Sequence, residues 1–103
     1  MELLTAELRA ELPRRNVQDG NKNPIVYAKF FFSTGNWRWF VTEGEEDGDD
    51  FLFFGYVIGQ EAEWGYFSLK ELQGISIDGL TVERDLYFQT GTLNEVLIRE
   101  QRG

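Results

Sequence analysis

The sequence contains no cysteine and no histidine, and only two prolines and one methionine among its 103 residues. Without cysteine there is no disulfide, thiol nucleophile or zinc–thiolate site. Without histidine there is no imidazole base or ligand, and nothing titrates near neutral pH unless a carboxylate is shifted there. No apolar run approaches the ~18 residues that span a bilayer, and the charged start MELLTAELRAEL is unlike an export signal. We therefore expect a cytoplasmic protein with no membrane partner.

The residues that are abundant are apolar and aromatic. Hydrophobic residues make up 42% of the chain, including nine Phe, four Tyr and three Trp. Because each aromatic side chain buries a large area, such a chain can form a core without disulfides or metals. Its length suits one domain and is too short for two well-packed ones. We expect a single domain over residues 1–103 with no cofactor.

Negative charge is concentrated in one place. The net charge is −8, and residues 43–50 contain six acidic residues and no basic one. The eighteen acidic residues of the chain less these six leave twelve against ten Lys and Arg, a net charge of −2. The rest of the chain therefore resembles an ordinary mixed surface. Because no stripe of Lys and Arg is available to neutralise phosphates, we expect no direct binding to nucleic acid.

The acidic segment is the candidate partner-binding site, through Glu43, Glu45, Glu46, Asp47, Asp49 and Asp50. One interpretation is mimicry of DNA. Eight extended residues reach at most ~28 Å, and B-DNA carries about 16 charges over that length. Six carboxylates are far fewer, so the mimicry would be local. A calcium site is a weaker interpretation, because the spacing does not match an EF-hand loop, and we assign no metal ligand. The structural alternative is a solvated, mobile hairpin loop.

The strands are predicted from runs of β-branched and aromatic residues, which cover 25–32, 37–42, 51–58, 63–67 and 80–88. Short connections join the first four, which is typical of an antiparallel meander. The run 51–58 is apolar on both faces and is therefore predicted to be an inner strand. Gly55 within it indicates a bulge or a closely packed neighbour.

The helices are predicted from leucine spacing and from capping signals. Leu4, Leu8 and Leu12 recur every four residues, which predicts an amphipathic helix over 2–12. Ser68 with Glu71, and Thr92 with Glu95, have capping-box spacing and predict two short helices. Turns are expected at Asp19-Gly20 and Asp78-Gly79. The predicted fold is α+β: an antiparallel β-meander of four to five strands packed with an N-terminal helix and two short helices.

Two further groups of residues are candidates for function. The aromatic residues Trp37, Trp39, Phe40, Phe53, Phe54, Trp64, Tyr66 and Phe67 form either a core layer or an exposed contact surface. The run Glu83-Arg84-Asp85, with Glu43 and Glu63, contains carboxylates that flank an arginine. An acid/base pair requires such groups to lie within reach of each other. We expect an ordinary ion pair instead, and assign no catalytic residue.

Five stretches of the chain together carry a family resemblance. They are LLTAELRAELP at the start, Trp37-x-Trp39 with Thr42-Glu43-Gly44, Phe51-Leu52-Phe53-Phe54-Gly55, Glu63-x-Gly65-Tyr66-Phe67-Ser68-Leu69-x-Glu71-Leu72, and Glu83-Arg84-Asp85-Leu86-x-Phe88. Over nearly its whole length the chain resembles the bacterial family called domain of unknown function 2958. The resemblance implies a small protein carried by plasmids, integrative elements and phages, often near antirestriction-type genes. It implies no reaction and no catalytic residues.

Three hypotheses of function follow. The first is a non-enzymatic protein-interaction module of a mobile element, which inhibits a host nucleic-acid-acting defence enzyme in the manner of an anti-CRISPR or antirestriction protein. Its partner would be a basic nucleic-acid-binding protein. The second is a structural or accessory homodimer that acts through an aromatic face of its sheet. The third is a carboxylate hydrolase that uses a divalent metal ion. Monomer and homodimer both remain open.

Overall fold

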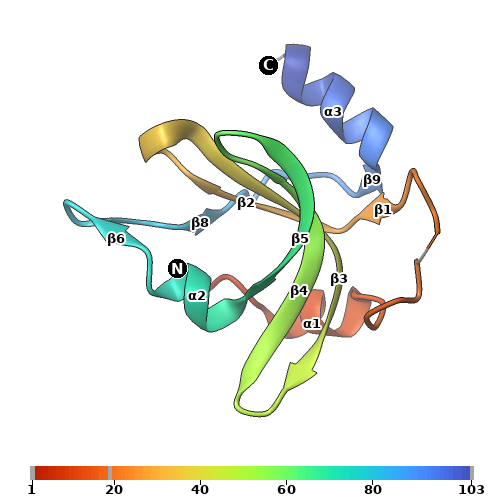
Figure 1. Ribbon diagram of the computed structural model, residues 1–103, viewed down its shortest axis with the longest axis horizontal. Helices are drawn as coiled ribbons and strands as arrows, with labels where there is room; N and C mark the ends of the chain where they lie inside the picture. Colours follow the sequence, from red (N-terminus) through yellow and green to blue (C-terminus); the bar gives the residue numbers. More distant parts are fainter. Residues whose placement is uncertain (1, 19, 103) are drawn as a thin grey trace.

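A five-stranded antiparallel sheet forms the centre of the protein, whose computed structural model describes residues 2–18 and 20–102 (Figure 1). The predicted Asp19-Gly20 turn includes a residue outside the described part. The strand order is β5-β4-β3-β2-β8. The strands are β2 (Ala28–Phe32), β3 (Trp37–Asp47), β4 (Asp50–Ile58), β5 (Ala62–Ser68) and β8 (Glu83–Arg84). The first four form a meander, which confirms the predicted α+β architecture, and β4 is an inner strand.

Three short helices flank the sheet. These are α1 (Ala6–Glu11), α2 (Leu69–Gln73) and α3 (Leu93–Arg102), and a single 3-10 turn, η1 (Thr34–Asn36), joins β2 to β3. Helix α1 is shorter than the predicted 2–12, because the Thr5 hydroxyl accepts the Leu8 N–H at 3.1 Å and starts the helix there. Both predicted capping boxes are present, and Gly74 ends α2.

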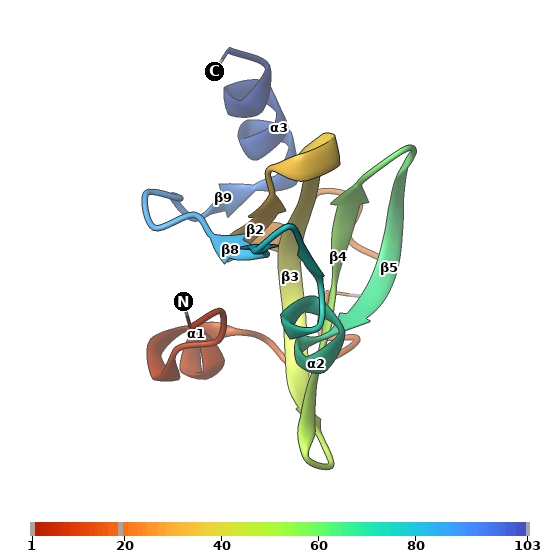
Figure 2. The same cartoon turned by 90° about the vertical axis from the view of Figure 1, so that its left-hand side faces the viewer.

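Apolar side chains form two cores, one on each face of the sheet. On one face Phe30, Val41 and Phe53 pack with Leu8 of α1 and with Leu72 of α2. On the other face Phe40 packs with Val96 of α3. Because successive side chains of a strand point to opposite faces, this division explains why the inner strands are apolar throughout. Figure 2 shows the sheet from its side, with α1 and α3 well separated.

Two predicted strands are broken. The strand 25–32 divides at Tyr27, and its first part, β1 (Ile25–Val26), pairs with β9 (Gly91–Thr92). The strand 80–88 was also predicted too long. It divides into β7 (Leu80–Thr81), which forms a hairpin with β6 (Ser76–Ile77) through the predicted turn at 78–79, and the two-residue β8. Asp85 then accepts the Tyr87 N–H at 2.9 Å, and this local side-chain turn ends the strand.

Gly55 allows two strands to approach closely, as predicted. A Cβ atom at this position would lie 1.9 Å from the Phe40 carbonyl oxygen, so no other residue fits. The register between β3 and β4 shifts between Val41 and Glu43, which places a β-bulge directly beside this contact. The bulge sets the orientation of the second half of β3, where the acidic segment begins.

Candidate interaction surfaces

The acidic segment is a β-hairpin, which corrects the interpretation of it as a loop. Strand β3 continues to Asp47, β4 begins at Asp50, and only two residues form the turn. Gly48 adopts a φ of 61°, which a tight hairpin turn requires. Glu45 and Glu46 lie opposite Leu52 and Phe51, so the run of acids is held in register by apolar partners.

The first two carboxylates of the segment bind the protein's own backbone. Glu43 is only 3% exposed and accepts the N–H groups of Asn16 at 2.9 Å and of Gln18 at 2.7 Å. Glu45 accepts the Arg15 N–H at 2.9 Å. Strand β2 pairs with β3 only as far as Val41, so the chain after α1 takes its place along this edge. These two acids therefore hold that chain to the sheet.

Most of the outer carboxylates have intramolecular partners as well. Glu46 forms an ion pair with Arg9, and Asp49 forms one with Lys70 at 2.8 Å. Asp50 accepts the N–H groups of Phe51 at 2.7 Å and Lys70 at 3.1 Å. Desolvation raises the pKa of Asp50, but these hydrogen bonds outweigh it and lower the pKa below its ordinary value.

Asp47 differs from the other five acids. It is exposed, and its carboxylate makes no hydrogen bond or ion pair with any other residue that the structure describes. Together with the exposed Glu46 and Asp49 it forms the acidic tip, the name used below for these three residues. Figure 1 shows this end of the β3–β4 hairpin projecting beyond the rest of the molecule. The tip is therefore the part of the segment that a partner can reach.

The predicted aromatic set divides between core and surface. Trp39, Phe40, Phe53 and Phe67 are buried, whereas Trp37, Trp64 and Tyr66 are exposed and Phe54 is half-buried. Trp37 stacks on Trp39 at a ring distance of 5.9 Å, at the far end of the strand from the acidic segment. The other exposed rings lie together on β4 and β5. The prediction of a core layer thus holds for half of the set.

Four rings on β4 and β5 form a continuous patch, here called the aromatic face: Phe54, Tyr56, Trp64 and Tyr66. Cross-strand pairing places Phe54 opposite Tyr66 and Tyr56 opposite Trp64. Phe54 lies 4.8 Å from the Tyr66 ring and 5.8 Å from the Trp64 ring, and Tyr56 lies 5.2 Å from Trp64. Trp64 is 40% exposed and Tyr66 54% exposed. Aromatic pairs of this kind hold the exposed rings rigidly.

A hollow of about 170 Å³ lies where the loop after α1 meets the aromatic face. Two of its polar side chains already have partners, and Gln18 accepts the Ile25 N–H and donates to the carbonyls of Ile25 and Thr42. The Thr42 hydroxyl donates to the Phe54 carbonyl at 3.1 Å. A ligand here would therefore meet the rings of Phe54 and Trp64 beside the side chain of Asn21.

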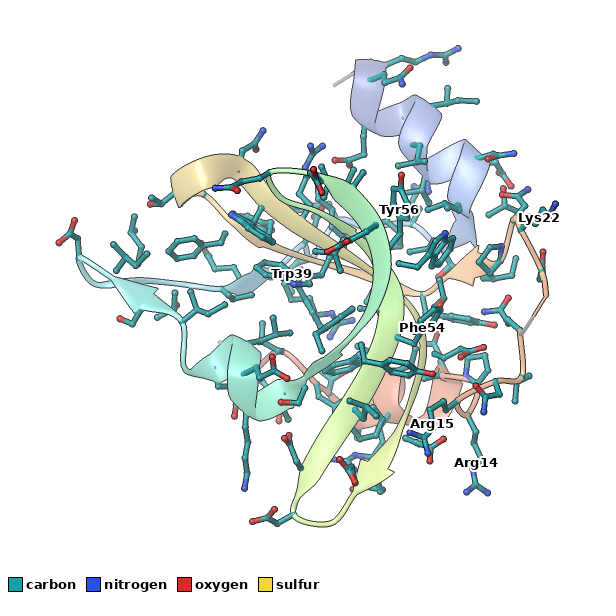
Figure 3. The ribbon with its side chains drawn as sticks, viewed as in Figure 1. Arg14, Arg15, Lys22, Trp39, Phe54 and Tyr56 are labelled. Carbon is teal, nitrogen blue, oxygen red and sulfur yellow. The ribbon has the colours of Figure 1, made fainter. Side chains whose placement is uncertain are left out.

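Three cationic side chains project from the same loop. Figure 3 shows Arg14, Arg15 and Lys22 on the side of the sheet where Phe54 and Tyr56 lie, with Trp39 on the opposite side. All three are exposed, and Arg15 Nε lies 3.7 Å from Glu45 Oε1. They form a partial basic rim that the sequence did not reveal, because only two of them are adjacent in the chain.

The structure does not assemble the carboxylate–arginine candidate. Arg84 Nη1 donates to the Thr5 hydroxyl at 3.1 Å, beside the start of α1. Glu43 instead binds the loop after α1, and Glu63 is on β5, at the opposite edge of the sheet from β8. Over residues 2–18 and 20–102, no group of three or more acidic side chains is arranged to hold a metal ion.

One charged cluster was missed from the sequence. Glu100 of α3 pairs with Lys29 Nζ at 3.0 Å and with Arg38 Nη1 at 3.3 Å, and Asp85 lies 3.9 Å from Lys29. Arg38 Nε is buried and has no hydrogen-bond partner among the described residues. The sequence signal for this cluster is one cation inside each of two apolar runs, Lys29 in 25–32 and Arg38 in 37–42. The cluster joins α3 to the sheet.

The fold and its surfaces define a small α+β protein that exposes an aromatic face and an acidic tip. A family model described as Protein of unknown function (DUF2958) matches residues 3–99, so the chain belongs to this family, as the resemblance indicated. No curated protein and no solved structure matched the chain. None of the helices in the described residues has the length and apolar character needed to cross a membrane.

Proposed function

We propose that this chain is a non-enzymatic protein-interaction module, acting in the cytoplasm, that binds its partner through the aromatic face. The observation that carries the proposal is the exposure of Trp64 and Tyr66 on two paired strands of the central sheet. Exposed aromatic residues held by a rigid scaffold are the side chains most enriched among energetically dominant interface contacts. Their own neighbours already orient them, so binding costs little conformational entropy.

Charge favours a protein partner over nucleic acid. The chain has a net charge of −8, and the basic rim beside the aromatic face consists of three side chains, one of which is paired with Glu45. Single-stranded nucleic acid requires both stacking rings and a cationic groove along its backbone. A protein surface with apolar contacts and a few acidic groups suits the aromatic face and its rim better.

The acidic tip supports a second candidate function, the capture of a basic protein. Its three acids project from the molecule, and the Asp47 carboxylate has no partner among the described residues. This candidate retains the hypothesis of a mobile-element protein that inhibits a host enzyme acting on nucleic acid. Only the tip is available for it, because Glu43, Glu45 and Asp50 hold the protein's own backbone. Because B-DNA carries one charge per ~1.7 Å of its axis, the three charges of the tip could imitate only a very short piece of a DNA backbone.

Affinity capture from the native cells with two matched variants separates the candidates. Trp64→Thr/Tyr66→Thr removes the exposed rings but keeps residues that favour strands, and Asp47→Asn/Asp49→Asn removes charge from the tip. We expect the aromatic variant to lose the captured protein, and the tip variant to retain it in high salt. Loss in the tip variant, with elution of the wild-type complex by salt, would support the second candidate instead. Capture that neither variant reduces contradicts both.

A further inference from the structure

Strand β5 has an outer edge that no other strand of the described residues covers. It is the terminal strand of the sheet, and its seven residues pair with β4 on one side only. Figure 2 shows β5 as the outermost strand, with no helix or strand beyond it in that view. The opposite edge of the sheet is the two-residue β8, which is too short to template another strand. The free backbone groups of the sheet are therefore concentrated on β5.

This edge lacks the features by which monomeric proteins protect their edges. The strand AEWGYFS contains no proline and one charged residue, Glu63. Its pairing with β4 runs without a register shift from Leu52–Ser68 to Ile58–Ala62, so no bulge bends it away. A regular edge strand of this length with a single charge is a template for pairing with another chain.

Gly65, at the centre of β5, has no role within the chain itself. Its φ is not in the positive range, and a Cβ atom built on it would have no neighbour within 4 Å. Gly55, directly across on β4, is by contrast required by contact with the Phe40 carbonyl. A glycine weakens a strand, and one that its own fold does not need marks the close approach of another backbone.

We propose that β5 pairs antiparallel with β5 of a second copy of this chain, about a two-fold axis at Gly65. In this register Trp64 lies opposite Tyr66 of the second copy, an aromatic pair of the kind that stabilises sheets. Glu63 lies opposite Phe67 of the second copy, so the strand's one charge does not meet itself. The proposed register contains two such Trp64–Tyr66 pairs, one on each side of the axis. A shift of two residues in either direction leaves a single aromatic pair, Trp64 with Trp64 or Tyr66 with Tyr66.

The pairing is also compatible with the acidity of the chain. Gly65 pairs with Gly55, and Asp49 lies six residues before Gly55, a distance of about 20 Å along the strand. An antiparallel two-fold pair directs the two acidic tips to opposite ends, about 40 Å apart. This separation far exceeds the Debye length of about 8 Å at physiological salt. Repulsion between the tips is therefore screened.

The inference rests on the proposed function, because it assigns a second copy to the surface around Trp64 and Tyr66. It joins the two aromatic faces into one continuous surface across the dimer. The partner proposed above would then bind a surface with rings from both copies. The two proposals can fail separately, since a monomer also presents the aromatic face.

Light scattering of the full chain tests the pairing. We expect a mass twice the 12.0 kDa of one chain for the wild type and a mass of one chain for Gly65→Lys. The substitution fits a monomer, because the space beside Gly65 is open, but it brings two like charges together in the dimer. Tyr87→Lys adds the same charge at a residue that is 93% exposed and should remain dimeric. Circular dichroism verifies that both variants are folded.

A cysteine cross-link provides a measurement that does not depend on destabilising the dimer. Because the chain has no cysteine, Gly65→Cys introduces a single thiol that would face its own copy across the axis. We expect mild oxidation to yield a covalent dimer, whereas Tyr87→Cys stays monomeric on a denaturing gel. A monomeric wild type, or equal cross-linking of the two variants, overturns the pairing and leaves the proposed function standing. If the wild type is a monomer and Gly65→Lys loses the captured protein, the edge would belong to that partner instead.

Discussion

Residues of the same chemical type have different roles within the acidic segment. Glu43 is buried against the backbone of Asn16 and Gln18, whereas Asp47, four residues later, is exposed and its carboxylate has no partner among residues 2–18 and 20–102. The two differ because the loop after α1 runs beside Glu43, on the side of β3 where β2 no longer pairs, and its backbone N–H groups bind this carboxylate. Composition does not distinguish a structural acid from an available one, but the register does.

Replacing Glu43 should therefore destabilise the protein far more than replacing Asp47. Glu43→Ala leaves two N–H groups without their charged acceptor, and we expect the free energy of unfolding to fall by about 2–3 kcal/mol. Asp47→Ala should change it by less than about 0.5 kcal/mol. Urea denaturation of the two variants measures the difference. Equal losses would show that Glu43 does not hold the loop after α1.

Asp50 should give the fold a dependence on acid pH. Desolvation raises the pKa of its carboxyl group, but hydrogen bonds from Phe51 and Lys70 hold the pKa below the ordinary value of 3.8. A lowered pKa in the folded state stabilises the protein above the unfolded pKa, and this contribution is lost as the pH falls through the folded pKa. The stability advantage of the wild type over Asp50→Asn should be constant above about pH 4 and should shrink below it. Denaturation midpoints across this range check the sign, and an advantage that grows on acidification would contradict it.

At the scale of elements, local signals predicted the starts of the helices, and distant contacts decided the ends of the strands. The capping boxes at Ser68 and Thr92 use groups three residues apart, so the sequence contains all that is needed. The acidic run looked like a loop because its charges have no partners nearby in the chain. Arg9 and Lys70 come from the two helices on one face and neutralise charges of the hairpin. That proximity exists only in the folded sheet.

The aromatic face was only half predictable for the same reason. The run 63–67 predicts a strand, and the alternation assigns Trp64 and Tyr66 to one side of it. Whether that side is covered depends on where α3 lies, and α3 packs on Phe40 and Ile58 rather than on Trp64. The position of a helix over a sheet follows from the connections at both of its ends. The sequence pattern of the helix does not contain this information.

Gly55 provides a test of how the elements are fitted together. In Gly55→Ala the new methyl group would overlap the Phe40 carbonyl at the bulge, and β3 and β4 would have to separate. We expect the free energy of unfolding to fall by about 2–3 kcal/mol. Gly74→Ala, at the end of α2, has its nearest atom at 3.3 Å and should change stability by less than about 1 kcal/mol. Thermal and urea unfolding of this pair are the measurement, and a tolerated Gly55→Ala would argue against the close contact.

At the scale of the whole molecule, the two cores differ in size and in how they are closed. The larger core holds both α1 and α2 against one face, whereas the smaller one holds α3 with Val26 and Phe40. In Figure 1 α3 lies at the opposite end of the molecule from the other helices. The smaller core has four buried residues with partly buried ones around them, so the ion pairs of Glu100 are a substantial part of what fixes α3.

Glu100→Ala should therefore loosen α3 without unfolding the meander. The substitution leaves Lys29 and Arg38 beside each other without the carboxylate between them, and we expect a loss of about 2 kcal/mol in the stability of this unit. Hydrogen exchange should rise in α3 and β9 while the amides of β3 and β4 keep their protection, because local opening needs only the contacts of one unit. Gln101→Ala, at the exposed neighbouring residue, is the matched control and should leave exchange unchanged. A uniform rise over all strands would show instead that the two cores unfold as one.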